Sequence, residues 1–208
     1  MKQIILLILL LTVSLLLFSA TKISLYGDYN RKYPNQDLLT LDGNAFIKKG
    51  TEIEIYTDYA TITGSDGDYH TVDASGNTFV VFESGLASSN FLNYDLDTSK
   101  GLLSGVYKVI LNESNIKMSE IDSLNFDMNN KTYFGNKSKE QVNIEYKENL
   151  LINSDYFEYY ENEQKLYLKG NVFIDDKKNE RIIKSEELNY FLEDDSFNGK
   201  QVQVQIDL

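Results

Sequence analysis

Few residues in this chain have the types and spacing that catalysis requires. His70, within GDYHTVD, is the only histidine in 208 residues, so a multi-histidine metal site cannot form, and any nucleophile would have to be brought to it by the fold. The acidic pairs Glu52 with Glu54 and Asp194 with Asp195 have the residue types of a glycosidase. Such carboxylates on a strand face are usually solvated, and no Gly-rich phosphate loop, Cys/His cluster or basic aromatic patch is present. The sequence predicts no enzymatic activity, metal or cofactor.

The elements that would position any site are β-strands. Apolar or small residues alternate with polar ones over Leu41–Ile47, and the same parity recurs over Leu168–Ile174. A second kind of strand carries apolar or aromatic pairs spaced i, i+2, such as Leu92 with Tyr94. A slip of one residue would turn every inner side chain outward, so the retained phase predicts one consistently apolar face.

A repeated phrase connects these strands. L-x-G-N-x-F-I occurs at Leu41–Ile47 and again at Leu168–Ile174. Similar strand pairs separate a series of glycines, which indicates one repeat array rather than two domains. We expect each glycine to mark a bulge or a corner where a strand bends; the alternative is a glycine that leaves room for a ligand. The series consists of Gly43, Gly76, Gly105, Gly135, Gly170 and Gly199.

Composition agrees with an all-β fold. The chain has 15 Tyr and 11 Phe but one Pro, and aromatic residues suit a pleated surface whereas Pro removes a ladder donor. The formal net charge of −12 disfavours nucleic acid and anionic membrane surfaces as partners. The sequence has no cysteine, which excludes disulfides and a lipid-modified cysteine.

The chain begins with a charged, apolar and then small-residue pattern. Lys2 precedes the apolar run Ile4–Phe18, which Ser19 and Ala20 follow. Residues 1–20 are therefore expected to be a signal peptide or a retained membrane anchor, which places the rest of the chain outside the cytoplasm. We expect a linker at 21–37 and a single β-domain at 38–208.

The C-terminal stretch changes phase. Val202, Val204 and Ile206 are one step out of register with the parity of Leu168–Ile174, which indicates a bulge or a terminal strand with a different partner. QVQVQIDL has little charge and no Pro to protect an edge. Strand addition to another protein and an ordinary closing strand are both open interpretations.

The phrase LTLDGNAFIKKGTEIEIYTDYA from Leu39, followed by SSNFLNYDLDTSKGLLSG from Ser88, resembles the OstA-like family of lipopolysaccharide transport proteins (LptA/LptC type). The resemblance is best over residues 38 to 110, recurs at 150 to 205, and includes Asp58 and Ser88-Ser89 at positions that the family fills with small or acidic residues. It implies a twisted, slightly open β-jellyroll whose apolar groove shields acyl chains in the periplasm. It also implies partners of the same fold (LptC- and LptD-type) or further copies of this chain, joined by edge strands.

If the resemblance holds, the inward apolar residues contact lipid; core packing is the alternative role for each of them. They are Leu41, Ala45, Ile47, Ile53, Ile55, Leu92, Tyr94, Leu124, Phe126, Phe157, Tyr159, Leu168, Val172, Ile174, Leu188 and Tyr190.

Three further interpretations stay open. A structural β-solenoid or filament protein of the cell envelope would use the same repeat and fill its interior with side chains. An inner-membrane-anchored subunit of the LptC type would keep the leader. An outer-membrane barrel is disfavoured because the strands are rich in tyrosine and acid and lack a lipid-facing band.

Overall fold

The structure is a computed structural model that describes residues 22–33 and 36–206. Its 16 strands form one sheet, and every pairing described is antiparallel. The expected leader at 1–20 lies outside the described residues. Within them, no helix is long and apolar enough to cross a membrane.

Along the described part of the chain the secondary structure is a succession of strands, and one 3-10 turn, η1 (Glu161–Glu163), lies between β12 and β13. Their bounds are β1 Ile23–Tyr26, β2 Tyr29–Tyr33, β3 Leu38–Lys49, β4 Ile53–Ser65, β5 Asp68–Phe82, β6 Gly85–Asp95, β7 Lys100–Leu111, β8 Ile116–Asp127, β9 Thr132–Asn136, β10 Val142–Tyr146, β11 Leu150–Ser154, β12 Tyr156–Tyr160, β13 Lys165–Asp176, β14 Arg181–Phe191, β15 Ser196–Lys200 and β16 Gln203–Ile206.

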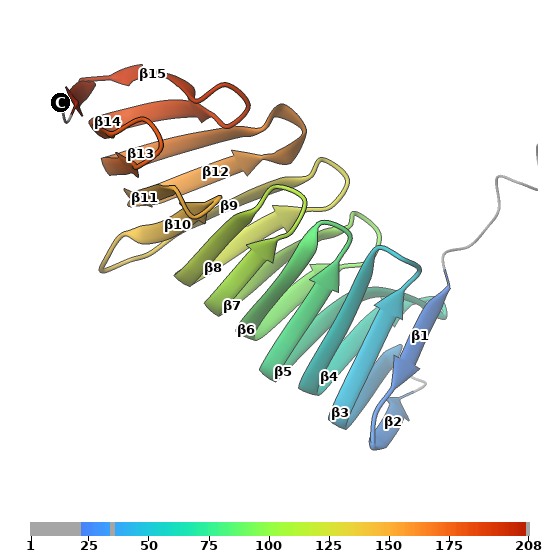
Figure 1. Cartoon of the computed structure of the whole chain (residues 1–208). Helices are drawn as coiled ribbons and strands as arrows, with labels where there is room; N and C mark the ends of the chain where they lie inside the picture. The colour runs from blue at the N-terminus through green and yellow to red at the C-terminus, as the bar shows by residue number, and fades with distance from the viewer. Residues whose placement is uncertain (1–21, 34–35, 207–208) are drawn as a thin grey trace, which may run out of the picture.

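The sheet is folded over on itself into two layers (Figure 1). Layer A contains the short strands β1, β10, β11 and β16, and layer B contains β2, β9, β12 and β15. Each long strand gives one half to each layer; the second half of β3 pairs with β1 and the first half with β2. The prediction of an all-β jellyroll built from repeated strand pairs is confirmed.

Glycine and asparagine make the bend. In β3 the register with β4 shifts between Asp42 and Ala45, and the two residues between them, Gly43 and Asn44, have φ of 73° and 45°. A Cβ on Gly43 would lie 2.8 Å from the Asp28 carboxylate, which accepts a hydrogen bond of 2.8 Å from the Asn44 side chain. The G-N of the repeated phrase is therefore a left-handed bulge that directs the strand from one layer to the other.

Other long strands, β7 and β13, bend in the same way. Gly170 and Asn171 have φ of 77° and 46°, and Gly105 has φ of 61°. The side chain of Asn171 donates to Asp155 at 2.9 Å. Gly76, with φ of 98°, lies at the register shift between Ser75 and Thr78. The other two glycines of the series differ, because Gly135 and Gly199 lie within β9 and β15 rather than in the bend itself.

The phase change at the C-terminus has the same cause. Gln201, with φ of 55°, separates β15 from β16, and both strands pair with β14. The shift is a bend, and the partner strand does not change.

The sheet begins before residue 38. β1 and β2 lie within the segment expected to be a linker, and both pair with β3. They form the N-terminal end of the folded sheet, and β15 and β16 form the C-terminal end (Figure 1).

Candidate functional site

The inner face of layer A presents a row of apolar side chains along its middle. Each residue of this row is the direct cross-strand partner of the next, from β1 to β16. The row consists of Leu25, Ile47, Ile55, Val80, Ala87, Val109, Met118, Ile144, Ile152, Ile174, Ile183 and Val204.

Layer B faces this row with two rows of its own. One is mostly leucine and alanine and lies near the bend: Leu41, Ala60, Ala74, Leu92, Leu103, Leu124, Gly135, Phe157, Leu168, Leu188 and Gly199. The other lies at the opposite, free edge and is rich in aromatic rings: Tyr94, Gly101, Phe126, Tyr133, Tyr159, Leu166, Tyr190 and Phe197. We call the free edges, where the hairpin turns of both layers meet, the mouth.

All sixteen residues predicted to face inward do so, and each is at most 3% exposed. These residues belong to strands from β3 to β14, and the fold places them on the facing inner sides of layers A and B. Whether they contact lipid stays a prediction.

Sequence reasoning missed several inner residues of equal burial. Val80, Val109, Ile144 and Ile183 are 0–1% exposed and complete the central row of layer A. The i, i+2 parity that identified Ile53 and Ile55 also holds for Val142 and Ile144, so a signal was present in the weaker middle copy of the repeat.

The jellyroll is open only in its backbone: within the described residues no β-ladder joins the free edges of the two layers, and side chains fill the space between them. Ile47, Val80 and Leu168, in the middle of the two facing layers, have 0% exposure, so neighbouring side chains cover them completely. The reason is that the two apolar faces pack directly against each other, which removes their surface from water.

The mouth is closed by side chains alone. Within the described residues, backbone pairing and the backbone hydrogen bonds of the turns join segments of the same layer. Across the mouth, the Tyr146 hydroxyl donates to the Leu192 carbonyl at 3.2 Å, and Arg181 donates to the Asp195 carbonyl at 2.7 Å. The two layers are therefore continuous at the bend and are joined at the mouth by side-chain hydrogen bonds. We call these contacts across the mouth the latch.

A part-buried ion pair, Lys49 with Glu52, belongs to this latch. Tyr94 of layer B donates to the carboxylate of Glu52, in a turn of layer A, and Lys49 Nζ contacts both Glu52 at 2.8 Å and Ser99 Oγ at 2.8 Å. Burial raises the pKa of Tyr94, and the Glu52 carboxylate raises it further. Burial opposes the ionisation of Glu52, but hydrogen bonds from Lys49 and Tyr94 outweigh it and lower its pKa.

Two further tyrosines repeat this arrangement with neutral partners. The hydroxyls of Tyr133 and Tyr159 lie 2.7 Å from Ser84 Oγ and Ser114 Oγ, respectively. Burial raises the pKa of Tyr159 to about 12. The two rings stack with centroids 6.2 Å apart, so the latch is an aromatic wall with a polar outer rim.

Glu161 lies beside this wall, near Tyr133 and Lys131. The residue is 6% exposed, and neither carboxylate oxygen has a hydrogen-bond partner among the described residues. Burial raises the pKa of Glu161, because an ion is costly where water is excluded.

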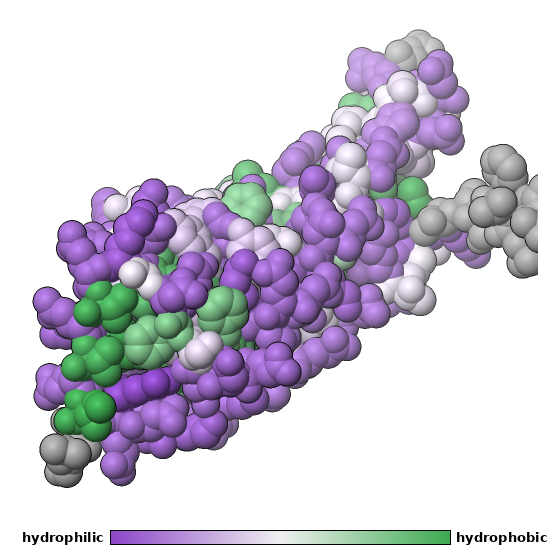
Figure 2. All heavy atoms as spheres, turned by 90° about the horizontal axis from the view of Figure 1, so that it is seen from above, coloured by the Kyte–Doolittle hydropathy of each residue, from purple (hydrophilic) through white to green (hydrophobic). Residues whose placement is uncertain are grey.

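The interior is uncovered at the C-terminal end. Val204 and Ile206 of β16 continue the inner face but are 46% and 62% exposed. Figure 2 shows hydrophobic residues gathered at this end of the molecule.

His70 does acquire a nucleophile and an acid from the fold. Its Nε2 lies 2.9 Å from Ser65 Oγ, and its Nδ1 lies 2.8 Å from the Asp97 carboxylate, which is the order of a serine hydrolase triad. The side chains of His70 and Asp97 are 38% and 62% exposed, and none of the five cavities described includes these three residues. The cluster is exposed to solvent, whereas a triad holds its substrate in an enclosed pocket.

These features define a folded β-sheet with a packed apolar interior, uncovered at its C-terminal end, and a side-chain latch along the mouth. No family model matches the chain, and no curated protein matches it. Among solved structures, it is similar to the crystal structure of LptH, the LptA-homologous periplasmic component of the lipopolysaccharide transport device from Pseudomonas aeruginosa. That match has 8% identity and a TM-score of 0.26, and it covers 90% of this chain and 96% of LptH. The TM-score is too low for this likeness to carry an argument.

Proposed function

We propose that this protein carries lipopolysaccharide or a related glycolipid, and that it shields the acyl chains between layers A and B during transport to the outer membrane. The observation that supports the proposal most is the central apolar row of layer A, which continues strand by strand from Leu25 to Val204. Neighbouring side chains of this row are one strand spacing apart, so a sliding acyl chain would meet near-equivalent sites.

The energetics call for such an interior. Burying a methylene group is worth about 0.8 kcal/mol, so exposure of a tail of a dozen carbons to water would cost on the order of 10 kcal/mol. An apolar face replaces water around the tail without directional contacts, and selectivity for one lipid is not required.

The closed lumen makes opening a part of the proposal. A tail can enter from the side only if the mouth separates, and the mouth contains side-chain contacts such as Tyr133 with Ser84 rather than a β-ladder. The bend contains the left-handed pair Gly43 and Asn44, which would act as the hinge. The uncovered end at Val204 and Ile206 is a second route of entry.

Location and partners follow from the same proposal. The protein works in the periplasm, with its leader either removed or retained as an inner-membrane anchor. Among residues 22–33 and 36–206, β1 and β2 pair only with β3, and β15 and β16 pair only with β14. Each end of this part of the sheet would therefore offer its edge to a jellyroll partner of the LptC or LptD type, or to another copy of this chain.

Photocrosslinking in cells tests the proposal. A photoreactive residue at Phe126 or Leu168, which point inward at 3% and 0% exposure, is expected to label lipopolysaccharide. The neighbouring outward positions Asn125 and Tyr167 are the matched controls and should give no lipid adduct. Labelling that does not differ between inward and outward positions contradicts a lipid path through the interior.

A structural β-solenoid or filament protein is the second candidate, and the packed interior is the observation that favours it. Such a protein needs no opening, and its ends would join copies of itself. In the same crosslinking experiment it gives adducts between copies of this chain, from positions in β1 and β16, and no lipid adduct at Phe126 or Leu168.

A further inference from the structure

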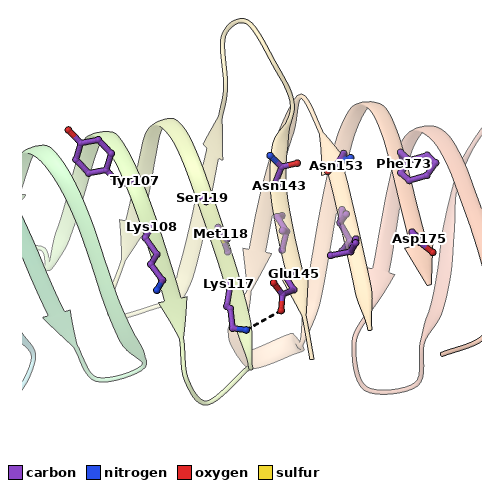
Figure 3. A pocket seen from close by; sticks show the side chains of 13 residues that line it. Tyr107, Lys108, Lys117, Met118, Ser119, Asn143, Glu145, Asn153, Phe173 and Asp175 are labelled. Carbon is purple, nitrogen blue, oxygen red and sulfur yellow. Dashed lines mark hydrogen bonds and ion pairs between the residues drawn. The ribbon is translucent and has the colours of Figure 1, made fainter. Parts of the chain in front are cut away.

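The outer face of layer A contains a groove that the proposed function does not use. Its volume is about 520 Å³, and it crosses the outer side of β7, β8, β10, β11 and β13. This is within the size range of small-molecule sites. Figure 3 shows Tyr107 and Phe173 at its two sides and Asn143 and Asn153 between them.

Small side chains create the hollow. One cross-strand row of the outer face runs through Lys108, Ser119, Asn143, Asn153 and Phe173. Its three central members are short, whereas Phe173 at one end and Tyr107, next to Lys108, are bulky. The two rings are four strands apart, or about 19 Å at about 4.8 Å per strand, so the groove is long and narrow with an aromatic ring at each end.

The amides in the groove are unengaged. Asn143 and Asn153 are direct cross-strand partners, and within the described part of the chain neither side chain makes a hydrogen bond, in contrast to Asn44, Asn77 and Asn171, whose amides each donate to an aspartate. Two opposed free amides offer four N–H donors and two carbonyl acceptors to a ligand.

The charges in the groove are balanced. Lys117 forms an ion pair with Glu145 at 3.0 Å, and the groove also contains Lys108 and Asp175, one charge of each sign. This balance favours an uncharged ligand. Leu151 lies on the lining with 38% of its surface exposed, which provides an apolar contact beside the amides.

We propose that this groove binds a linear, uncharged oligosaccharide that carries N-acetyl groups. The acetamido group has an N–H and a carbonyl for Asn143 and Asn153 and a methyl group for Leu151. The apolar faces of sugar rings stack on Tyr107 and Phe173. The proposal does not depend on whether the interior carries lipid, because the groove lies on the opposite face of layer A.

Calorimetric titration of the full chain tests the proposal. The chain is held in a detergent without a sugar head, and the probe is tetra-N-acetylchitotetraose, called chitotetraose below. Saturable binding is expected, and the double substitution Asn143→Ala with Asn153→Ala should weaken it by roughly tenfold or more through the loss of two hydrogen bonds. Tyr107→Ala should weaken it several-fold, whereas Tyr26→Ala, whose ring has the same 57% exposure on the same face, should not change it.

Two outcomes overturn the proposal. One is the absence of saturable binding at millimolar chitotetraose, or binding that the double substitution leaves unchanged while the unfolding temperature shows an intact fold. The other is equal affinity for cellotetraose, which lacks the acetamido group and would show that the groove does not recognise it. Neither outcome depends on the lipid crosslinking experiment, so the two proposals fail separately.

Discussion

The hydroxyl of Tyr94 in layer B donates a hydrogen bond to the carboxylate of Glu52, in a hairpin turn of layer A. The two residues are 42 positions apart in the chain and lie across the mouth of the folded sheet. Their contact joins the free edges of layers A and B, which share no backbone ladder within the described residues. The stability of the folded sheet should therefore depend on side-chain contacts of this kind.

Tyr94→Phe should destabilise the protein, because it removes the hydrogen bond of a buried hydroxyl to a part-buried charged group. The expected loss in free energy of unfolding is about 1.5–3 kcal/mol, measured by urea denaturation. Tyr56→Phe is the matched control: Tyr56 also donates to a glutamate, Glu54, at 2.9 Å, but its ring is 42% exposed, so the loss should stay below about 1 kcal/mol. Equal losses in the two variants would argue against a buried latch.

Glu161→Gln should stabilise the protein at neutral pH. The pKa of Glu161 is raised by burial, so the folded state retains its proton to higher pH than the unfolded state does. The stability linked to that proton is fully present below the usual value of 4.5 and is lost as pH rises through the raised folded-state pKa. The glutamine variant removes this loss, which urea denaturation across pH 4 to 8 would show.

Glu193→Gln provides the control for this substitution, because Glu193 is exposed and makes no side-chain hydrogen bond within the described residues. It should leave the pH profile unchanged. A Glu161→Gln variant that is less stable than the parent at pH 7 would show that the carboxylate has a partner in solution.

Acid should weaken the latch at Glu52 and at Asp176. Asp176 accepts a hydrogen bond of 2.7 Å from Arg181, the residue that also donates across the mouth to the Asp195 carbonyl. Burial opposes ionisation of both groups, but hydrogen bonds from Lys49 to Glu52 and from Asn179 and Arg181 to Asp176 lower both pKa values. Their stabilisation is present above the usual values of 4.5 and 3.8 and is lost as pH falls through the lower folded-state values. Asp176→Asn should reduce the acid sensitivity of the unfolding temperature; an unchanged slope would contradict this assignment.

Gly76→Ala should be far more damaging than Gly67→Ala. Both glycines have left-handed φ, 98° and 90° respectively, and alanine there costs about 1–2 kcal/mol. A Cβ on Gly76 would also lie 2.5 Å from the Asp58 carboxylate, whereas a Cβ on Gly67 would meet nothing within 4 Å. The difference between the two free energies of unfolding therefore measures the contact that fixes the bend, and equal losses would show that Asp58 moves aside freely.

Ser65 should not react with a fluorophosphonate probe, although His70 lies 2.9 Å from its hydroxyl. The expected result by mass spectrometry is an unmodified serine, and His70→Ala should change stability by less than about 1 kcal/mol because the contacts are exposed. Stoichiometric modification of Ser65 that His70→Ala abolishes would instead establish a functional triad.

The alternation of residues in the sequence determined which side chains face inward, because the side-chain period of a strand is two whatever the strand packs against. The repeated G-N phrase likewise determined that strands such as Leu38–Lys49 bend, since the backbone there needs left-handed φ that glycine and asparagine tolerate. These are local properties, and they were predictable for Leu41, Ile47 and Leu168.

Only the tertiary structure decided what lies between and outside the layers. The separation of two sheet faces depends on how all their side chains interdigitate, so the closure over Ile47 and Leu168 has no signature in any single strand. The meeting of Tyr94 with Glu52, and the placement of Asn143 and Asn153 between two distant rings, depend on pairings between segments far apart in the chain. Sequence parity assigns each residue to a face, but register and packing across the whole sheet decide which residues meet.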